Sequence, residues 1–122
     1  MSEKNKLPPM TLSDNETGEV FTLEFSRESV RFAESRGFSI SDVSDFPMTK
    51  VPDLFFYAFR KNHMRISKSR TDKILFEDLE GLTREQIERL VQLYSAPMDA
   101  LLRDDEDDGG AGPKNVKMTV EL

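Results

Sequence analysis

The sequence predicts a mainly α fold of the α+β class, in which an N-terminal β-hairpin packs on a small bundle of four to five helices. Two short alternating segments, residues 10–13 and 20–25, flank a run of turn-forming residues. Apolar residues at three- and four-residue spacing recur through most of the remaining chain. The length of 122 residues suits one domain with one core.

The predicted hairpin has a distinct inner face on its second strand. Phe21, Leu23 and Phe25 alternate with Val20, Thr22 and Glu24, and alternate residues of a strand point to opposite sides. A two-stranded ribbon is marginally stable alone. We therefore expect the aromatic side to pack on the helices.

The stretch from residue 47 to residue 63 predicts the central helix. Thr49 is a candidate N-cap and Pro52 falls in the first turn, so the helix is expected to begin near Lys50. Apolar residues then occupy nearly every side of the helix before Arg60. A helix that is hydrophobic all round belongs in the middle of a domain.

Shorter helices are predicted on both sides of the central one. The first covers residues 27–36 and ends at Gly37 in a left-handed cap. A later helix is capped by Ser69 or Thr71 and runs to about Glu80. Its inward-facing residues are Ile74, Leu75 and Leu79. The connector before the central helix is expected to be pinned to the core by Phe38, Ile40, Val43 and Phe46.

The last helix has the clearest signals. Thr83 and Gln86 have the spacing of a capping box. The apolar stripe that follows consists of Ile87, Leu90, Val91, Tyr94, Met98, Leu101 and Leu102. Because Pro97 lacks an N–H and crowds the preceding turn, we expect a kink or break near Ser95, then a short helix to about Arg103.

The chain ends are expected to lie outside the folded domain. Residues 1–9 are predicted to be a flexible N-terminus, residues 10–103 the single domain, and residues 104–122 a disordered acidic tail, since Asp104–Asp108 and the glycines after it cannot form a core. Residues 116–122 alternate like a strand. A docking peptide, a cloning remnant and no role all fit them, and we favour no role.

Composition argues against several classes of protein. The net charge of −6 repels phosphate backbones and anionic lipid, so neither a nucleic acid nor a membrane is an expected partner. The absence of cysteine removes disulfides, thiol nucleophiles and thiolate zinc sites. The residues after Met1 lead into two prolines rather than an apolar run, so we predict a cytoplasmic protein.

The sequence shows no catalytic arrangement. The single histidine, His63, stands at the end of the central helix, where a local hydrogen bond is expected, and a metal site would need several converging ligands. The candidate carboxylates are spread over turns and helix exteriors. They are Asp42, Asp45, Asp53, Glu77 and Asp78. We therefore predict no enzyme, no cofactor and no metal.

A series of motifs runs along residues 20–108. It comprises Arg36-Gly37-Phe38, Pro47-Met48-Thr49, Leu54-Phe55, Ala58-Phe59, His63, Leu93-Tyr94, Pro97, Leu101 and the acidic run. This order resembles the small tail assembly chaperones encoded in the tail gene clusters of long-tailed phages and prophages, which are similar in role to the lambda-type tail chaperone.

The resemblance implies binding to the tape measure protein and the tail tube protein in the host cytoplasm, with self-association compatible with a coating role. Such a chaperone needs exposed apolar surface. The candidate residues for it are Phe56, Tyr57, Leu93, Met98 and Leu101, each of which also fits a place in the core. The alternatives are an acidic regulator or inhibitor, such as an antitoxin or a DNA mimic, and a structural component of the phage tail.

Overall fold

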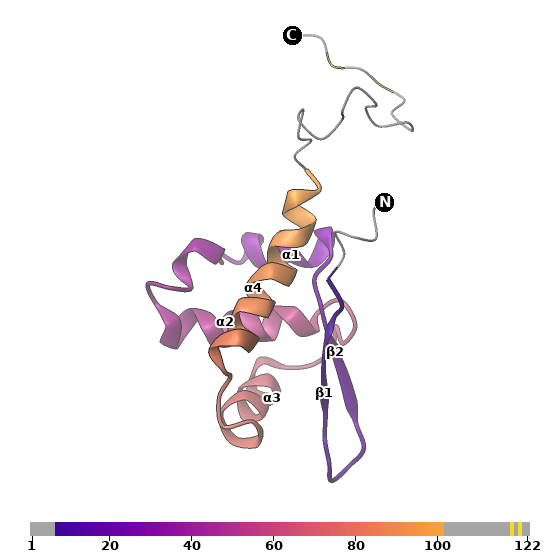
Figure 1. Cartoon of the computed structure of the whole chain (residues 1–122), viewed down its shortest axis with the longest axis vertical. Helices are drawn as coiled ribbons and strands as arrows, with labels where there is room; N and C mark the ends of the chain where they lie inside the picture. The colour runs from indigo at the N-terminus through magenta and orange to yellow at the C-terminus, as the bar shows by residue number, and fades with distance from the viewer. Residues whose placement is uncertain (1–6, 102–117, 119, 121–122) are drawn as a thin grey trace.

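The computed structural model describes residues 7–101 together with Met118 and Val120. Figure 1 shows a hairpin beside a group of helices. The elements are β1 (Met10–Ser13), β2 (Val20–Leu23), α1 (Arg27–Ser35), the 3₁₀-helix η2 (Ile40–Asp42), α2 (Pro47–Phe59), α3 (Lys68–Lys73), the π-helix η3 (Ile74–Asp78) and α4 (Arg84–Asp99). The predicted hairpin and helical bundle are confirmed. Residues 1–6 of the predicted flexible N-terminus, and residues 104–117, 119, 121 and 122 of the predicted acidic tail, lie outside the described residues.

β1 and β2 pair antiparallel, with Met10 opposite Leu23 and Leu12 opposite Phe21. Directly opposed residues share a face, so these four side chains form the inner side of the hairpin. Phe21 and Leu23 are buried, as is Phe25 beyond the strand. The predicted inner face is therefore confirmed.

The turn of the hairpin is closed by Asp14. Its carboxylate accepts the backbone N–H of Glu16 at 2.8 Å and that of Thr17 at 3.1 Å. The bond from Glu16, and to a smaller extent the bond from Thr17, favours the charged form of the Asp14 carboxyl. Both bonds therefore lower the pKa of that carboxyl. Gly18 adopts φ +79°, a left-handed conformation that suits glycine.

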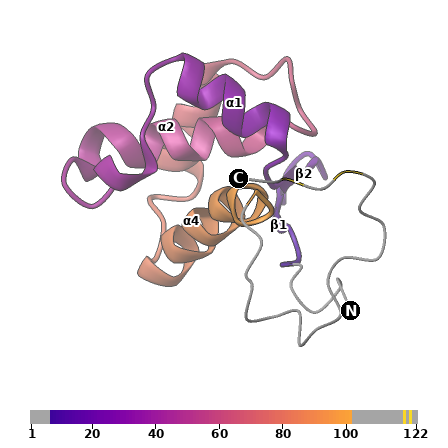
Figure 2. The ribbon, with the colours of Figure 1, turned by 90° about the horizontal axis from the view of Figure 1, so that it is seen from above.

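α2 is the central element. It contacts α1, α3, α4, β2 and η2, and Figure 2 shows it lying behind α1 with α4 on its other side. Leu54, Phe55, Ala58 and Phe59 have no exposed surface. The prediction of a central helix is confirmed, and it explains why apolar residues occupy nearly all sides of this segment.

The start of α2 differs from the prediction. The helix begins at Pro47, three residues before Lys50, and Thr49 lies inside it instead of capping it. Phe46 takes the N-cap position without a side-chain hydrogen bond. A proline at the first helical position has no N–H to satisfy and a backbone already suited to the helix, so Pro47 starts the helix where no polar cap stands.

The two shorter helices are capped by serines. Ser26 and Ser29 form a capping box at the start of α1, and Gly37, at φ +87°, ends that helix as predicted. The cap of α3 is Ser67, whose hydroxyl accepts the Arg70 N–H at 3.1 Å. The predicted caps at Ser69 and Thr71 are therefore wrong, and Thr71 is buried one turn further on.

α4 confirms the predicted capping box and contradicts the predicted break at Pro97, whereas the predicted kink there stays a prediction. The capping box of Thr83 and Gln86 is present. The helix runs without a break through Pro97 to Asp99, and the Ala100 N–H donates to the Ala96 carbonyl at 3.3 Å. Pro97 removes one hydrogen bond, the one to the Leu93 carbonyl, and the helix continues past that missing bond. Residues 102 and 103 lie outside the described range.

The core is rich in aromatic rings that meet edge to face, a favourable arrangement for their quadrupoles. The ring of Tyr94 lies 5.0 Å from that of Phe25 and 5.5 Å from that of Phe38. Tyr94 is almost fully buried, and burial raises the pKa of its hydroxyl to about 12. The core therefore links three parts of the chain, which are the hairpin, the connector that follows α1, and the helix α4.

Candidate interaction surface

The five residues predicted to bind a partner differ in how exposed they are. Tyr57 is 9% exposed and Leu93 is 4% exposed, so the prediction that they form a surface is wrong. Phe56 is half-buried against the core. Met98 and Leu101 are exposed at the end of α4, and their role in binding stays a prediction.

The central position of α2 explains the burial of Tyr57. Its ring packs edge-on against Phe38 at 5.4 Å and against Phe32 at 6.0 Å, and burial raises the pKa of its hydroxyl. Leu93 shares the buried face of α4 with Leu90 and Tyr94. Both residues were assigned to the surface because the sequence does not show that neighbouring elements surround α2.

Other apolar side chains, missed in the sequence, are exposed instead. Phe46 is 60% exposed, Met48 is 83% exposed and Phe76 is 55% exposed. The prediction that Phe46 pins the connector to the core is therefore wrong, whereas Phe38 and Val43 of the same connector are buried. The early start of α2 places Phe46 and Met48 at the outer end of that helix. We call these two residues the α2 tip.

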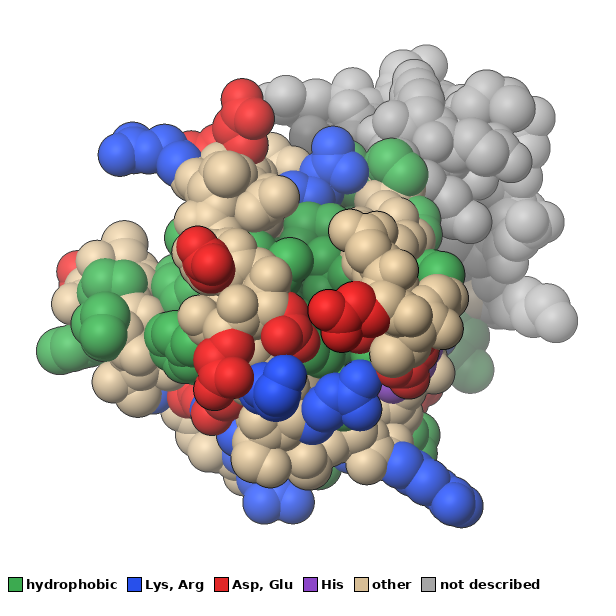
Figure 3. Space-filling model, turned by 90° about the horizontal axis from the view of Figure 1, so that it is seen from below, with side chains coloured by type: hydrophobic (Ala, Val, Ile, Leu, Met, Phe, Trp, Pro, Cys, Tyr) green, Lys and Arg blue, Asp and Glu red, His purple; other side chains and the backbone are tan. Residues whose placement is uncertain are grey.

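A groove lies between the hairpin and the segment formed by α3 and η3. Its volume is about 300 Å³. Figure 3 shows a hollow with hydrophobic side chains at its bottom. The apolar side chains that line the groove are Leu12, Phe21, Ile74 and Leu79. We call this feature the hairpin groove.

Charges of both signs surround the hairpin groove. The Arg70 guanidinium, which lines it, lies 3.0 Å from the Glu19 carboxylate, and the Lys73 ammonium lies 3.2 Å from the Asp78 carboxylate. Exposed ion pairs such as these contribute little to stability. Asp14 and Glu16 also line the groove, so its rim carries more acidic than basic side chains and favours a basic ligand over an acidic one.

The wall formed by η3 has an unusual backbone. The Leu79 N–H donates to the Ile74 carbonyl five residues earlier, at 2.8 Å, and Glu80 and Gly81 follow with φ of +57° and +100°. A π turn holds more residues than an α turn, so Leu79 no longer lies in line with Leu75. Leu79 was predicted to face inward and is exposed. Short π segments occur often at functional sites.

Phe32, a half-buried ring elsewhere, is covered by cations. The Arg60 guanidinium carbon lies 3.6 Å from the centre of the Phe32 ring, and that of Arg36 lies 4.8 Å from it. Cations over an aromatic face are attracted by its quadrupole. Phe32 is thus shielded within the chain, unlike the α2 tip.

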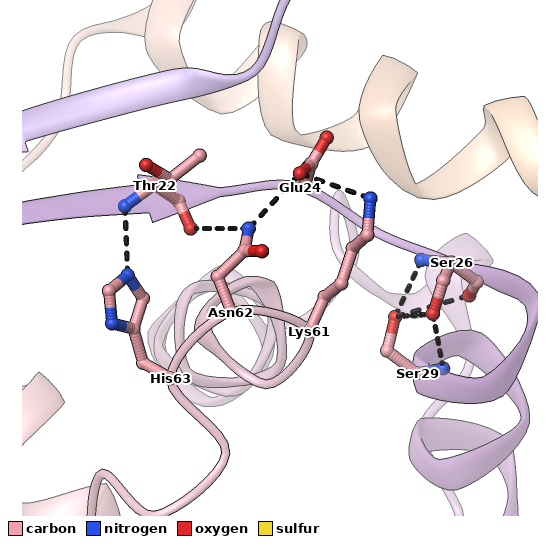
Figure 4. A network of polar contacts seen from close by, with 7 residues as sticks. All are labelled: Thr22, Glu24, Ser26, Ser29, Lys61, Asn62 and His63. Carbon is pink, nitrogen blue, oxygen red and sulfur yellow. Dashed lines mark hydrogen bonds and ion pairs between the residues drawn. The ribbon is translucent and has the colours of Figure 1, made fainter.

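His63 has a structural position rather than a catalytic one. Its Nε2 accepts the Thr22 N–H at 2.9 Å, and the Asn62 amide donates to the Thr22 carbonyl at 3.1 Å. Figure 4 shows both side chains reaching β2 from the end of α2. The hydrogen bond joins residues far apart in sequence, so the predicted local bond is wrong. The bond from Thr22 requires an Nε2 that carries no proton, so that its lone pair can accept.

Searches for other chemistry in the described residues were negative. No group of three or more histidine, cysteine or acidic side chains within residues 7–101, Met118 and Val120 is placed to hold a metal ion. In the same part of the chain, no helix is long and apolar enough to cross a membrane.

Comparison with known proteins gives one match. A family model described as "Domain of unknown function (DUF5055)" matches residues 1–122. No curated protein matches the chain, and no solved structure matches it.

Proposed function

Because the chain belongs to the DUF5055 family, whose description assigns no function, we propose a function from its own surface: a phage tail assembly chaperone. In this proposal the chain binds apolar helices of the tape measure protein in the host cytoplasm and keeps that protein from aggregating before the tail tube forms. Tail tube subunits are the second proposed partner.

The observation that carries the proposal is the exposure of the α2 tip. Phe46 and Met48 are large apolar side chains that the described part of the molecule leaves uncovered. Met64 and Met98 are also exposed, and methionine is common on surfaces that accept several partners because its side chain is flexible and polarizable. A protein that must coat a long, varied helix needs such tolerance.

The hairpin groove supplies a second point of contact. An amphipathic helix places an apolar side chain every three or four residues into such a depression. Leu12, Phe21 and Ile74 would surround that side chain, while the acidic excess of the rim would favour basic residues beside it. The groove and the α2 tip therefore fit the same class of partner.

The acidic run near the C-terminus provides a test that separates the chaperone from a DNA mimic. A mimic presents dense carboxylates to its partner, and of the described acidic residues Glu19, Glu24, Asp53, Asp72 and Asp78 each lie within 4.0 Å of a lysine or arginine side chain. Five of the 23 acidic residues fall in the run Asp104–Asp108, which follows the last described helix. Deleting residues 104–122 should abolish the action of a mimic and leave chaperone binding intact.

Co-expression with the tape measure protein of the same gene cluster tests the proposal. We expect the tape measure protein to be soluble with the wild-type chain and to sediment without it. Phe46→Asp combined with Met48→Asp should return most of it to the pellet, because two charges would enter an apolar contact. Leu79→Asp tests the hairpin groove in the same way.

Ser41→Asp is the matched control, since it adds a charge to another exposed position near α2. The proposal fails if the tape measure protein is equally soluble without the chain, or if the α2 tip and groove variants both act like the control. Mass spectrometry of purified virions separates the remaining alternative, because a structural tail component would be present in the particle and an assembly chaperone would be absent.

A further inference from the structure

The two edges of the hairpin differ. The outer edge of β2 is occupied by side chains from the end of α2, since the Thr22 N–H donates to His63 and the Thr22 carbonyl accepts from Asn62 (Figure 4). Just beyond β2, the Glu24 N–H donates to the Ala58 carbonyl at 3.1 Å. No further strand can pair along this edge.

The outer edge of β1 is open. In an antiparallel pair, two directly opposed residues either bond to each other or both point their backbone groups outward. Thr22 points outward, so Thr11 opposite it does too, and Ser13 follows by the alternation. Among the described residues, none forms a hydrogen bond with these outward groups of Thr11 and Ser13. Both residues are exposed.

An open strand edge is a template for another strand. Here the template is short, because Pro9 stands at the next outward position and has no N–H to donate. A strand that adds to β1 would therefore pair with only a few residues. Its side chains would extend the inner face formed by Met10 and Leu12 and the outer face formed by Thr11 and Ser13.

The C-terminal segment of the chain has the pattern that such a strand needs. Residues 116–122 read Val-Lys-Met-Thr-Val-Glu-Leu, with apolar and polar residues in strict alternation and three β-branched side chains. Met118 and Val120 are 86% and 77% exposed in the isolated chain. In a strand of this sequence, the apolar residues would share one side and match the inner face of the hairpin, and the polar residues Lys117, Thr119 and Glu121 would share the other.

We propose that residues 116–122 of one copy add as a third strand to the outer edge of β1 in a second copy. No described residue pairs with the outer edge of β1, and the side chains of Met118 and Val120 are exposed. Pairing between copies would cover both. Residues 102–115 span up to roughly 45 Å when extended, at about 3.3 Å per residue, which is enough to reach a neighbour.

Because donor and acceptor are different surfaces, the contact is head-to-tail. Such contacts close into rings or continue as filaments. A string of linked copies would bind a long helical partner with higher avidity than single copies. The pairing goes beyond the proposed function and does not depend on it, since the purified chain alone tests it.

The first experiment measures the mass of the purified full chain by light scattering over a range of concentrations. We expect species larger than the 14.0 kDa monomer, and a monomer at every concentration after deletion of residues 116–122. Met118→Asp with Val120→Asp should also give a monomer. Lys117→Ser with Glu121→Ser, which changes only the polar side, should leave the assembly intact.

The second experiment does not depend on whether the substituted variants fold. A synthetic peptide of residues 116–122 is added to the chain that lacks them, and amide exchange is followed. We expect the exchange rates of the Thr11 and Ser13 amides to fall by at least about tenfold, while the exchange rate of the Thr22 amide stays unchanged. Unchanged exchange at Thr11 and Ser13 would overturn the proposal.

Two other results would also overturn it. One is a full-length chain that stays monomeric throughout. The other is a monomer in which the Met118 methyl resonance already shows burial, because the segment would then pair within its own chain rather than with a second copy.

Discussion

Both ends of α2 carry large apolar side chains, but these side chains differ in their surroundings. Toward the C-terminal end, Phe55 and Phe59 are fully buried, and Asn62 and His63 beyond it bind the backbone of β2. At the N-terminal end, the α2 tip is uncovered. Exposure of an apolar residue here depends on which other elements reach it, not on its hydrophobicity.

This difference separates stability from partner binding. Changes at the C-terminal end of α2 should lower the free energy of unfolding, because they remove packed side chains or satisfied hydrogen bonds. Changes at the α2 tip should leave that free energy almost unchanged and affect only binding.

Phe59→Ala should have the largest effect. The ring packs edge-on against Phe55 at 5.1 Å and against Phe21 at 5.4 Å, and truncating a buried phenylalanine leaves a cavity that costs about 3–5 kcal/mol. Urea unfolding followed by circular dichroism measures the change. Phe46→Ala is the matched control at the other end of the helix, and equal losses for the two variants would remove the distinction between the ends.

His63→Ala should cost less, about 1–3 kcal/mol, because it leaves the Thr22 N–H without its partner. The imidazole also lies 5.2 Å from the Phe21 ring, so some packing is lost as well. Exchange of the Thr22 amide should become faster while amides within α4 are unaffected at low denaturant. An unchanged Thr22 exchange rate would show that His63 does not hold β2.

The free energy of unfolding should fall at alkaline pH because Tyr94 is buried. The pKa of its hydroxyl is about 12 in the folded chain against 10.0 for an ordinary tyrosine. Below pH 10 the Tyr94 hydroxyl is neutral in the folded and in the unfolded chain, so it gives the free energy of unfolding no pH dependence. As pH rises from 10 toward 12 the unfolded state ionises first, so stability falls. Tyr94→Phe should remove part of that fall, as measured by urea unfolding at each pH, and an identical fall in the variant would contradict the prediction.

Phe46→Asp combined with Met48→Asp should have the smallest effect, less than about 0.5 kcal/mol, since exposed positions contribute little to folding. Thermal unfolding should give nearly the same midpoint as the wild-type chain. A loss comparable to that of His63→Ala would mean that the α2 tip supports the fold.

Local sequence signals predicted the elements well. The alternation of Phe21, Leu23 and Phe25, the capping box at Thr83 and the stop at Gly37 each depend on residues close in sequence, and the structure has all three. The central position of α2 also followed from composition alone. These features are set by backbone geometry and by the period of the apolar pattern.

The candidate surface could not be predicted in the same way. Tyr57 and Leu93 are buried because α1, η2 and α4 pack around them, and Leu79 is exposed because a π turn displaces it. The bond between His63 and Thr22 joins residues 41 positions apart. Each outcome depends on how distant elements meet, which periodicity does not encode. The exposure of Phe46 had one local signal, the Pro47 that starts α2 directly after it.

Methyl NMR of the methionines, with segments of the tape measure protein as titrant, tests the proposed surface most directly. The chain has six methionines, of which Met48 lies on the α2 tip and Met10 is half-buried in β1. We predict that the Met48 resonance shifts and broadens as the segment binds, while the Met10 resonance stays in place. Binding with the Met48 resonance unchanged would show that the partner lies elsewhere and that the α2 tip is not the interaction surface.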